Sequence, residues 1–139
     1  MTATDPERLR VLETIIGPET LEDIQRLLDD LWSACDIPEL VQIHTDLAAG
    51  EIGANIVEHA ANGSPVRLRM EVQMSSEALR IHFTDDGRPA PVDLSRVTMP
   101  AAMSERGRGL AIAIRVLDQL SYQRDSEGNH WTLVHRLDS

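Results

Sequence analysis

The side chains with the clearest chemical potential lie on one predicted helix, four residues apart. Glu51, Asn55 and His59 stand at positions i, i+4 and i+8, so their side chains line one side of the helix. A solvated polar face would show the same spacing. However, Ile52 and Ile56 lie beside this stripe, and an asparagine inside a helix needs some compensation because its helix propensity is poor. The stripe is therefore a candidate site.

Two glycine-containing motifs follow along the chain. Asp85-Asp86-Gly87 comes at the end of a predicted strand. It fits a plain turn, because Asp-Gly is a common turn pair, or a carboxylate at a sheet edge that accepts a hydrogen bond from a ligand amine. Glu105-Arg-Gly-Arg-Gly-Leu110 leads into a predicted helix. It fits a helix-entry turn, or a phosphate site in which glycines allow close backbone approach and free N–H groups attract the anion.

The elements that must position these motifs follow from hydrophobic periodicity and from turn residues. The pattern predicts a strand over 8–16, helices over 21–34 and 38–61, strands over 66–74 and 78–84, an irregular segment over 88–106, a helix over 110–120, and strands over 122–125 and 130–137. Helices grouped against a mainly antiparallel, mixed sheet predict an α+β fold, a two-layer sandwich with three helices. The chain is expected to form one domain over 1–139.

Composition excludes several classes of protein. The 139 residues carry a net charge of −10 with 23 acidic residues and no lysine, which argues against binding to nucleic acid or to an anionic membrane. A phosphate-binding loop of the Gly-x-x-x-x-Gly-Lys type is excluded because the chain has no lysine. Cys35 is the single cysteine, so internal disulfides and cysteine-cluster metal sites are excluded. Neither a signal peptide nor a membrane span is visible, so we expect a cytoplasmic location.

The charge is uneven along the chain. Residues 1–62 hold three arginines against thirteen acidic residues, so the whole net charge of −10 lies there, and residues 63–139 are balanced. Four of the ten arginines in the second part lie in or beside the segment 88–106, namely Arg88, Arg96, Arg106 and Arg108. The acidic part is a candidate docking surface for a basic partner, and the arginine-rich part suits a polyanionic ligand.

Taken together, the order and spacing of the motifs resemble a known family. Glu-x-x-x-Asn-x-x-x-His on a helix, then Asp-x-Gly at a strand end, then Gly-x-Gly-Leu opening a helix, are similar to the GHKL ATP-binding superfamily. Within it, the chain resembles the short bacterial anti-sigma-factor serine/threonine kinases of the RsbW/SpoIIAB type. The resemblance spans essentially the whole chain, is most specific from Glu51 to Leu110, and implies the Bergerat-type ATP-binding sandwich.

The resemblance also implies roles for individual residues. Asn55 matches the asparagine that holds Mg²⁺ between the phosphates, and Glu51 matches the general base that activates a protein hydroxyl. Asp85 matches the acceptor of the adenine amino group, and Gly87 matches the glycine of the same motif. Residues 88–106 match the ATP lid. The other nucleotide-binding residues that we predict are His59, Arg106, Gly107, Arg108, Gly109, Leu110 and Thr132.

Two positions depart from the family pattern. Pro89 stands where the Asp-x-Gly motif often has a second glycine, and Gly128-Asn129 stands where many members have Gly-Thr. The resemblance implies an ATP- and Mg²⁺-dependent kinase whose substrate is a STAS-type anti-anti-sigma protein. Its other partner would be a sigma factor or another regulator, and it would form a homodimer through its N-terminal strand and helix. Two alternatives stay open: an ATP-binding module that sequesters a partner without phosphorylating it, and an acidic interaction domain without nucleotide.

Overall fold

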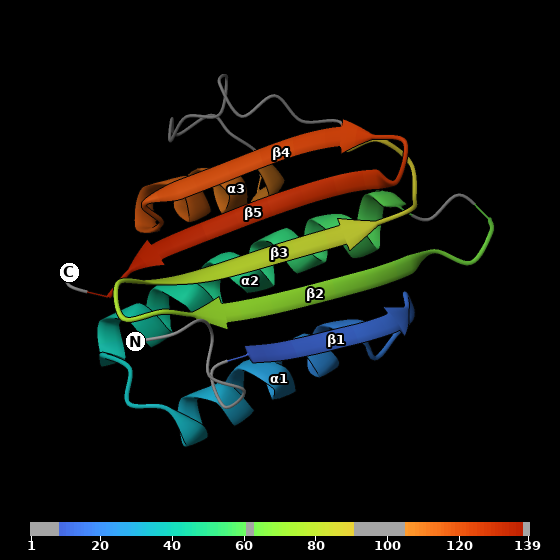
Figure 1. Ribbon diagram of the computed structural model, residues 1–139. Coiled ribbons are helices and arrows are strands. Elements are labelled where there is room, and N and C mark those ends of the chain that lie inside the picture. Colours follow the sequence, from blue (N-terminus) through green and yellow to red (C-terminus); the bar gives the residue numbers. More distant parts are fainter. Residues whose placement is uncertain (1–8, 61–62, 91–104, 138–139) are drawn as a thin grey trace.

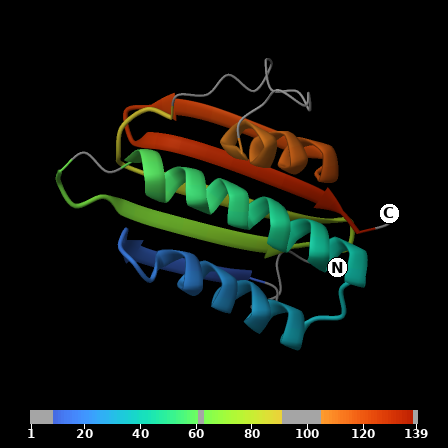
Figure 2. The same ribbon diagram turned by 180° about the vertical axis from the view of Figure 1, so that it is seen from behind.

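The computed structural model describes residues 9–60, 63–90 and 105–137. Its elements follow in the order β1 (Leu9–Ile15), α1 (Thr20–Ala34), α2 (Glu39–Ala60), β2 (Arg67–Met74), β3 (Ala78–Asp85), α3 (Glu105–Val116), β4 (Gln119–Asp125) and β5 (Gly128–Arg136). The strands form one sheet in the order β1-β2-β3-β5-β4. Figures 1 and 2 show the three helices together on one face of this sheet. The predicted two-layer α+β sandwich is confirmed.

Alternation along the central strands builds the core. In β2 the side chains of Leu68, Met70, Val72 and Met74 are buried while their neighbours are exposed or half-buried, because successive side chains of a strand point to opposite faces. The buried face packs against apolar stripes of α1 and α2, which include Ile24, Leu28, Leu31, Val41 and Ile52. None of the described helices lies over the opposite face (Figure 1), and we call it the open face of the sheet.

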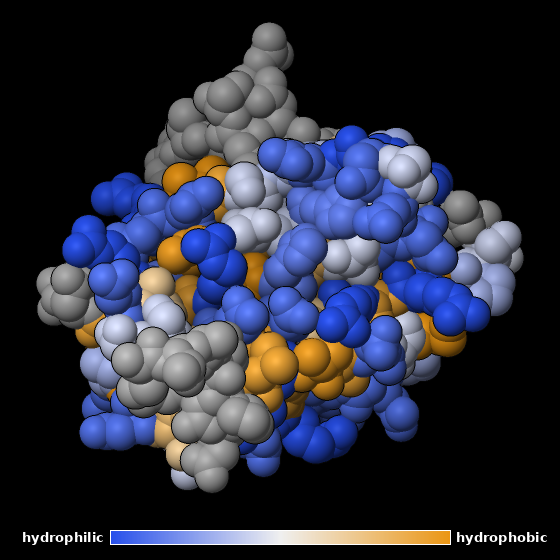
Figure 3. Space-filling view, in the orientation of Figure 1, coloured by the Kyte–Doolittle hydropathy of each residue, from blue (hydrophilic) through white to orange (hydrophobic). Residues whose placement is uncertain are grey.

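Most of the open face is hydrophilic, as Figure 3 shows, with a hydrophobic patch over β1. Val11 and Ile15 are exposed in β1, and they face outward because their antiparallel partners Glu71 and Arg67 do so. None of the described helices combines the length and the apolarity that crossing a membrane requires.

Three sequence predictions need correction. The last helix begins at Glu105 rather than at Leu110 and ends at Val116, since Leu120 pairs with Leu133 in the β4–β5 ladder. A short apolar run fits a helix and a buried strand equally, which explains the error. All pairings among the described strands are antiparallel, so this sheet is not mixed. The segment predicted to be irregular over 88–106 already enters α3 at Glu105, and 91–104 lies outside the described residues.

Candidate functional site

The candidate site forms where β3 ends and β5 begins. Asp85 is 2% exposed, and its Oδ1 accepts hydrogen bonds from the backbone N–H of Gly87 and from Nδ2 of Asn129, both at 2.9 Å. Gly128 makes this approach feasible. Its φ is +126°, and an added Cβ would overlap the carbonyl oxygen of Asp85 and lie 3.0 Å from Cα of Asp86. A residue with a side chain would therefore push the two strand ends apart.

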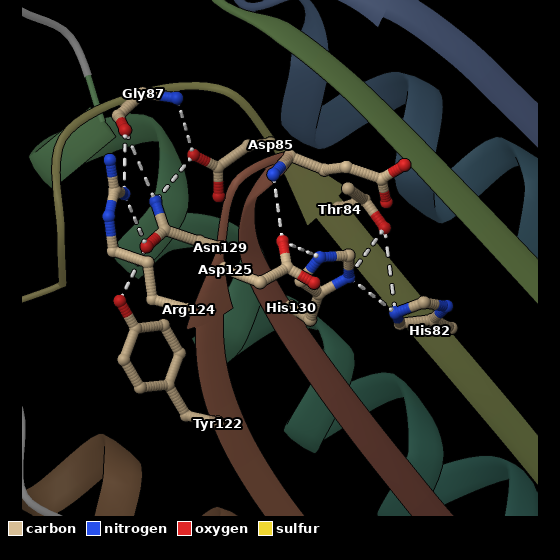
Figure 4. Close-up of polar contacts among 10 residues, drawn as sticks. His82, Thr84, Asp85, Gly87, Tyr122, Arg124, Asp125, Asn129 and His130 are labelled. Carbon is tan, nitrogen blue, oxygen red and sulfur yellow. Dashed lines mark hydrogen bonds and ion pairs between the residues drawn. The ribbon is translucent and has the colours of Figure 1, made fainter.

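Strand β4 completes the network around the same carboxylate (Figure 4). Tyr122 donates its hydroxyl hydrogen to Oδ1 of Asn129, and Nη1 of Arg124 donates to the same oxygen and to the carbonyl of Gly87, each at 3.0 Å. The pairing of Arg124 with Asn129 puts both side chains on the helix-covered face. We call Asp85, Gly87, Tyr122, Arg124 and Asn129 the Asp85 cluster.

Burial has a clear electrostatic effect on Asp85. Desolvation raises the pKa of its carboxyl above the ordinary value of 3.8, while the hydrogen bonds from Asn129 and Gly87, and the more distant charge of Arg124, work against this rise. Such a buried carboxylate favours a polar hydrogen-bond donor as its neighbour, because burial makes an uncompensated charge costly. The site thus offers a buried, oriented hydrogen-bond acceptor.

The polar stripe of α2 reaches the same place. Asn55 and His59 line a cavity of about 10 Å³ together with Asp85 and Asn129, and Arg88 and Ala90 also line it. The Nδ2 group of Asn55 donates to the backbone carbonyl of Glu51 at 3.4 Å, which provides a partner for a polar side chain inside a helix. The Nε2 atom of His59 is buried without a hydrogen-bond partner in the described part of the chain.

Two hydrogen bonds to the segment 88–90 keep this cavity small. Asn129 Nδ2 donates to the carbonyl of Arg88 at 2.7 Å, and the backbone N–H of Ala90 donates to the Tyr122 hydroxyl at 2.9 Å. These bonds hold residues 88–90 against the Asp85 cluster. A space of about 10 Å³ barely holds a water molecule, so a larger ligand must displace this segment.

A larger cavity of about 420 Å³ lies at the same end of the sheet and is lined by residues of β1, β2 and β3 and by Glu127. Asp85 borders it, but no residue of the α2 stripe does. We place the candidate site at the smaller cavity because the stripe and the Asp-x-Gly motif meet there. Size alone is a weaker guide than convergent polar groups.

The third motif meets the stripe through Gly109. An added Cβ on Gly109 would overlap the Glu51 carboxylate and lie 2.7 Å from its Cδ. The first turns of α3 therefore pack directly against Glu51. Gly107, Arg106 and Arg108 lie in the same helix, but the side chains of 105–108 are outside the described residues. Leu110 is 5% exposed and belongs to the hydrophobic core.

Thr132 is not brought to this site. It alternates with the buried Trp131 and Leu133 and pairs with His82, so it lies on the open face. The residues that sequence reasoning missed are Tyr122, Arg124, Gly128 and Asn129. A signal was present at Gly128-Asn129, because the glycine has the positive φ and the asparagine follows it into the last strand.

Comparisons with known proteins agree with the fold. A family model described as the histidine kinase-like ATPase domain matches residues 17–135. Among curated proteins, no sequence matches the chain.

Two solved structures share the fold. One contains the RsbU and RsbW domains of Rv1364c from Mycobacterium tuberculosis, with a TM-score of 0.63 and 16% identity over 92% of this chain and 32% of that chain. The other is the histidine kinase domain of the blue-light activated histidine kinase EL346 from Erythrobacter litoralis, with a TM-score of 0.58 and 19% identity over 85% of this chain and 59% of that chain. The chain thus spans about a third and somewhat more than half of these two chains.

Proposed function

Because the chain belongs to the histidine kinase-like ATPase domain family, we propose that it is an ATP-dependent kinase that phosphorylates a serine or threonine of a regulatory partner protein. The observation that carries the proposal is the convergence of three motifs. Asn55 and Asp85 line one cavity, and Gly109 packs against Glu51, one helical turn before Asn55. Asp85, the polar stripe of α2 and the start of α3 therefore lie one after another along a single site.

Asp85 fits the recognition of adenine. Its hydrogen bonds from Gly87 and Asn129 both end on Oδ1, so we assign Oδ2 to the exocyclic amino group of the base. Asn129 holds the carboxylate in orientation, and Arg124 and Tyr122 hold Asn129 in turn. An ordered acceptor of this kind discriminates against a base that lacks the amino group, since a buried carboxylate would lose its partner.

The phosphate end is assigned to α2 and to the start of α3. When bound, ATP supplies the phosphoryl group and Mg²⁺ neutralises charge on its phosphates. The side-chain oxygen of Asn55 is a ligand of the kind that Mg²⁺ accepts. Nε2 of His59 lies 3.9 Å from the Glu58 carboxylate and has no hydrogen-bond partner among the described residues, so we assign it a polar contact with the nucleotide. The N-terminus of α3, with Arg106, Gly107 and Arg108, provides positive potential for the phosphates.

Glu51 is assigned as the base that takes the proton from the substrate hydroxyl. Its carboxylate is half-buried and lies against Gly109, where an added Cβ would overlap it. The partner class follows from the resemblance to RsbW-type kinases and from the shared fold with a structure that contains an RsbW domain. We propose a STAS-domain protein as the substrate, and a sigma factor or another regulator as the second partner.

One observation favours a second candidate function, a module that sequesters a partner without phosphorylating it. Leu40, Ile43 and Leu47 of α2 are 55%, 54% and 40% exposed. Their spacing puts them on one side of the helix, and a row of large apolar side chains in water marks a surface for protein contacts. This surface does not require catalysis, so the two functions differ in whether phosphate is transferred.

The test uses ATP labelled in its γ-phosphate, Mg²⁺ and purified STAS-domain proteins as acceptors. We expect Glu51→Gln to keep ATP affinity and to lower transfer by about 100-fold or more, as for loss of a general base. Glu39→Gln, an exposed glutamate at the start of the same helix, is the matched control and should transfer at the wild-type rate.

The outcomes separate the proposals. Loss of ATP binding in Glu51→Gln would refute the assignment of Glu51 as the base. ATP binding without transfer to any acceptor by the wild-type protein would favour the sequestering module. Absence of an ATP-induced rise in melting temperature, with and without Mg²⁺, would refute both nucleotide-dependent functions.

A further inference from the structure

A second polar cluster lies directly behind the Asp85 cluster, on the open face. Thr84, Asp125 and His130 are the sequence neighbours of Asp85, Arg124 and Asn129, and alternation sends them to the opposite side of the sheet. The cross-strand pair Thr84–His130 confirms that two of them share a face. Together with His82 and Glu127 they form what we call the open-face cluster. Figure 4 labels His82, Thr84, Asp125 and His130.

The distances within this cluster are short. Oδ1 of Asp125 lies 2.9 Å from Nε2 of His130, and Nδ1 of His130 lies 3.2 Å from Nε2 of His82. The Thr84 hydroxyl is 3.4 Å from the same His130 nitrogen. The potential ligand atoms of Asp125, Glu127 and His130 all lie within 4.8 Å of one another.

We propose that Asp125, Glu127 and His130 bind a divalent transition-metal ion such as Zn²⁺ on the open face, with His82 as the positioning residue for the His130 ring. Two carboxylates and one imidazole are a ligand set that Zn²⁺ accepts. The imidazole nitrogen disfavours Mg²⁺ and Ca²⁺, which take oxygen ligands. This site is separate from the proposed nucleotide site, because the sheet lies between them, and it does not rest on the proposed kinase activity.

The hydrogen bonds around His130 allow it to act as a ligand. Without an ion, the Nε2 hydrogen of His130 points to the carboxylate of Asp125. With an ion on Nε2, the ring proton must sit on Nδ1, where Nε2 of His82 and the Thr84 hydroxyl are the acceptors in reach. Ligating histidines generally donate their second N–H to such a partner, which fixes the ring orientation and the tautomer.

The test is calorimetric titration of the full, chelator-treated chain with ZnCl₂ in the absence of nucleotide. We expect one saturable site per chain. His130→Gln and Asp125→Asn should each weaken Zn²⁺ binding at least tenfold, while circular dichroism and the melting temperature of the metal-free protein show that both variants fold. His82→Gln should weaken binding by about 10- to 100-fold, the usual effect of losing a partner of a ligating histidine.

Two controls and one spectroscopic measurement make the test specific. His44→Gln removes a histidine from the other close pair, in which Nδ1 of His44 lies 2.9 Å from Nε2 of His135, and should leave Zn²⁺ affinity unchanged. Asn55→Ala should also leave it unchanged. Ring-nitrogen NMR should show the proton of His130 on Nδ1 in the Zn²⁺-bound wild type, and a mixture of tautomers in His82→Gln.

The proposal fails if the wild type shows no saturable Zn²⁺ binding. It also fails if His130→Gln and Asp125→Asn bind as tightly as the wild type, or if His44→Gln is the variant that loses the ion. A His82→Gln variant with wild-type affinity and an unchanged His130 tautomer would overturn the positioning role of His82.

Discussion

Two aspartates at the same end of the sheet lie on its opposite faces, in opposite environments. Asp85 lies under the helices, 2% exposed, and burial raises the pKa of its carboxyl. Asp125 lies on the open face with its side chain 56% exposed. The backbone N–H of Glu127 and, next, the ring of His130 lower the pKa of its carboxyl. The residue type is the same and both strands pair with β5, yet the two pKa shifts have opposite signs.

This difference shows that alternation along the strands places side chains in two environments, one covered by helices and one open to solvent. On the helix-covered face, burial makes the charge of a carboxylate energetically unfavourable, so an oriented carboxylate there suits a neutral hydrogen-bond donor. The open face leaves a carboxylate ionised and within reach of cations, which suits a metal. Three predictions test this contrast, from a change that disrupts both clusters to one that touches only the exposed aspartate.

The largest effect is expected from Gly128→Ala, because Gly128 supports both faces. Its φ of +126° is unfavourable for alanine, and the new Cβ would overlap the carbonyl of Asp85. We expect a loss of about 3 kcal/mol in the free energy of unfolding, from backbone strain and separation of the strand ends. Urea denaturation measures it.

Gly50→Ala is the matched control for this substitution. Gly50 lies inside α2, and an added Cβ there meets no atom within 4 Å, so alanine should stabilise the helix by about 0.5–1 kcal/mol. Equal effects of the two substitutions would contradict the role given to Gly128.

The second prediction concerns Asp85→Asn, which keeps an acceptor oxygen but removes the charge. We expect ATP affinity to fall at least tenfold, measured by calorimetry, because the single remaining oxygen already accepts from Gly87 and Asn129. The nucleotide-free variant should be at least as stable as the wild type at neutral pH, since the buried charge is gone.

The raised pKa of Asp85 also predicts how the stability difference between the wild type and Asp85→Asn changes with pH. The raised pKa means that folded Asp85 holds its proton more tightly than the unfolded chain does, whose pKa is near 3.8. The wild type therefore loses stability relative to Asp85→Asn as pH rises from that value through the raised pKa, and the difference is constant above it. Urea denaturation over this range measures it, and a wild type that gains stability relative to the variant would contradict the raised pKa.

Much of the buried face was predictable because its signals are periodic and local. The four-residue spacing of Glu51, Asn55 and His59 locates their helix face. The alternation of 66–74 locates a half-buried strand, and both predictions are confirmed at the level of secondary structure. Leu120 shows the limit, since an apolar residue in a short run fits either element until its cross-strand partner is known.

The partners of Asp85 were not predictable in the same way. Asn129 reaches Asp85 because β3 and β5 pair in a register that sets these two residues opposite each other, and Arg124 joins them because it lies opposite Asn129 in the β4–β5 ladder. Strands β3 and β5 are far apart in the sequence, so no local pattern encodes their register. The β3–β5 register also places Thr132 opposite His82 on the open face, although the family resemblance implied a place in the site.

The smallest effect is expected from Asp125→Asn in the metal-free protein, and its sign is the opposite of that for Asp85. The lowered pKa of Asp125 means that the folded state binds its proton less tightly than the unfolded state. The stability that this carboxylate contributes is therefore present above the ordinary aspartate pKa and is lost as pH falls through the lowered value.

Urea denaturation of the wild type and of Asp125→Asn should thus differ slightly at neutral pH, and the difference should shrink on acidification. The effect is small because an exposed carboxylate is well solvated in both states. A wild type that gains stability relative to Asp125→Asn as pH falls would mean that Asp125 behaves like Asp85. In that case the hydrogen bonds from Glu127 and His130 would not explain the pKa of the Asp125 carboxyl. The difference between the two faces of the sheet would then need a cause other than burial.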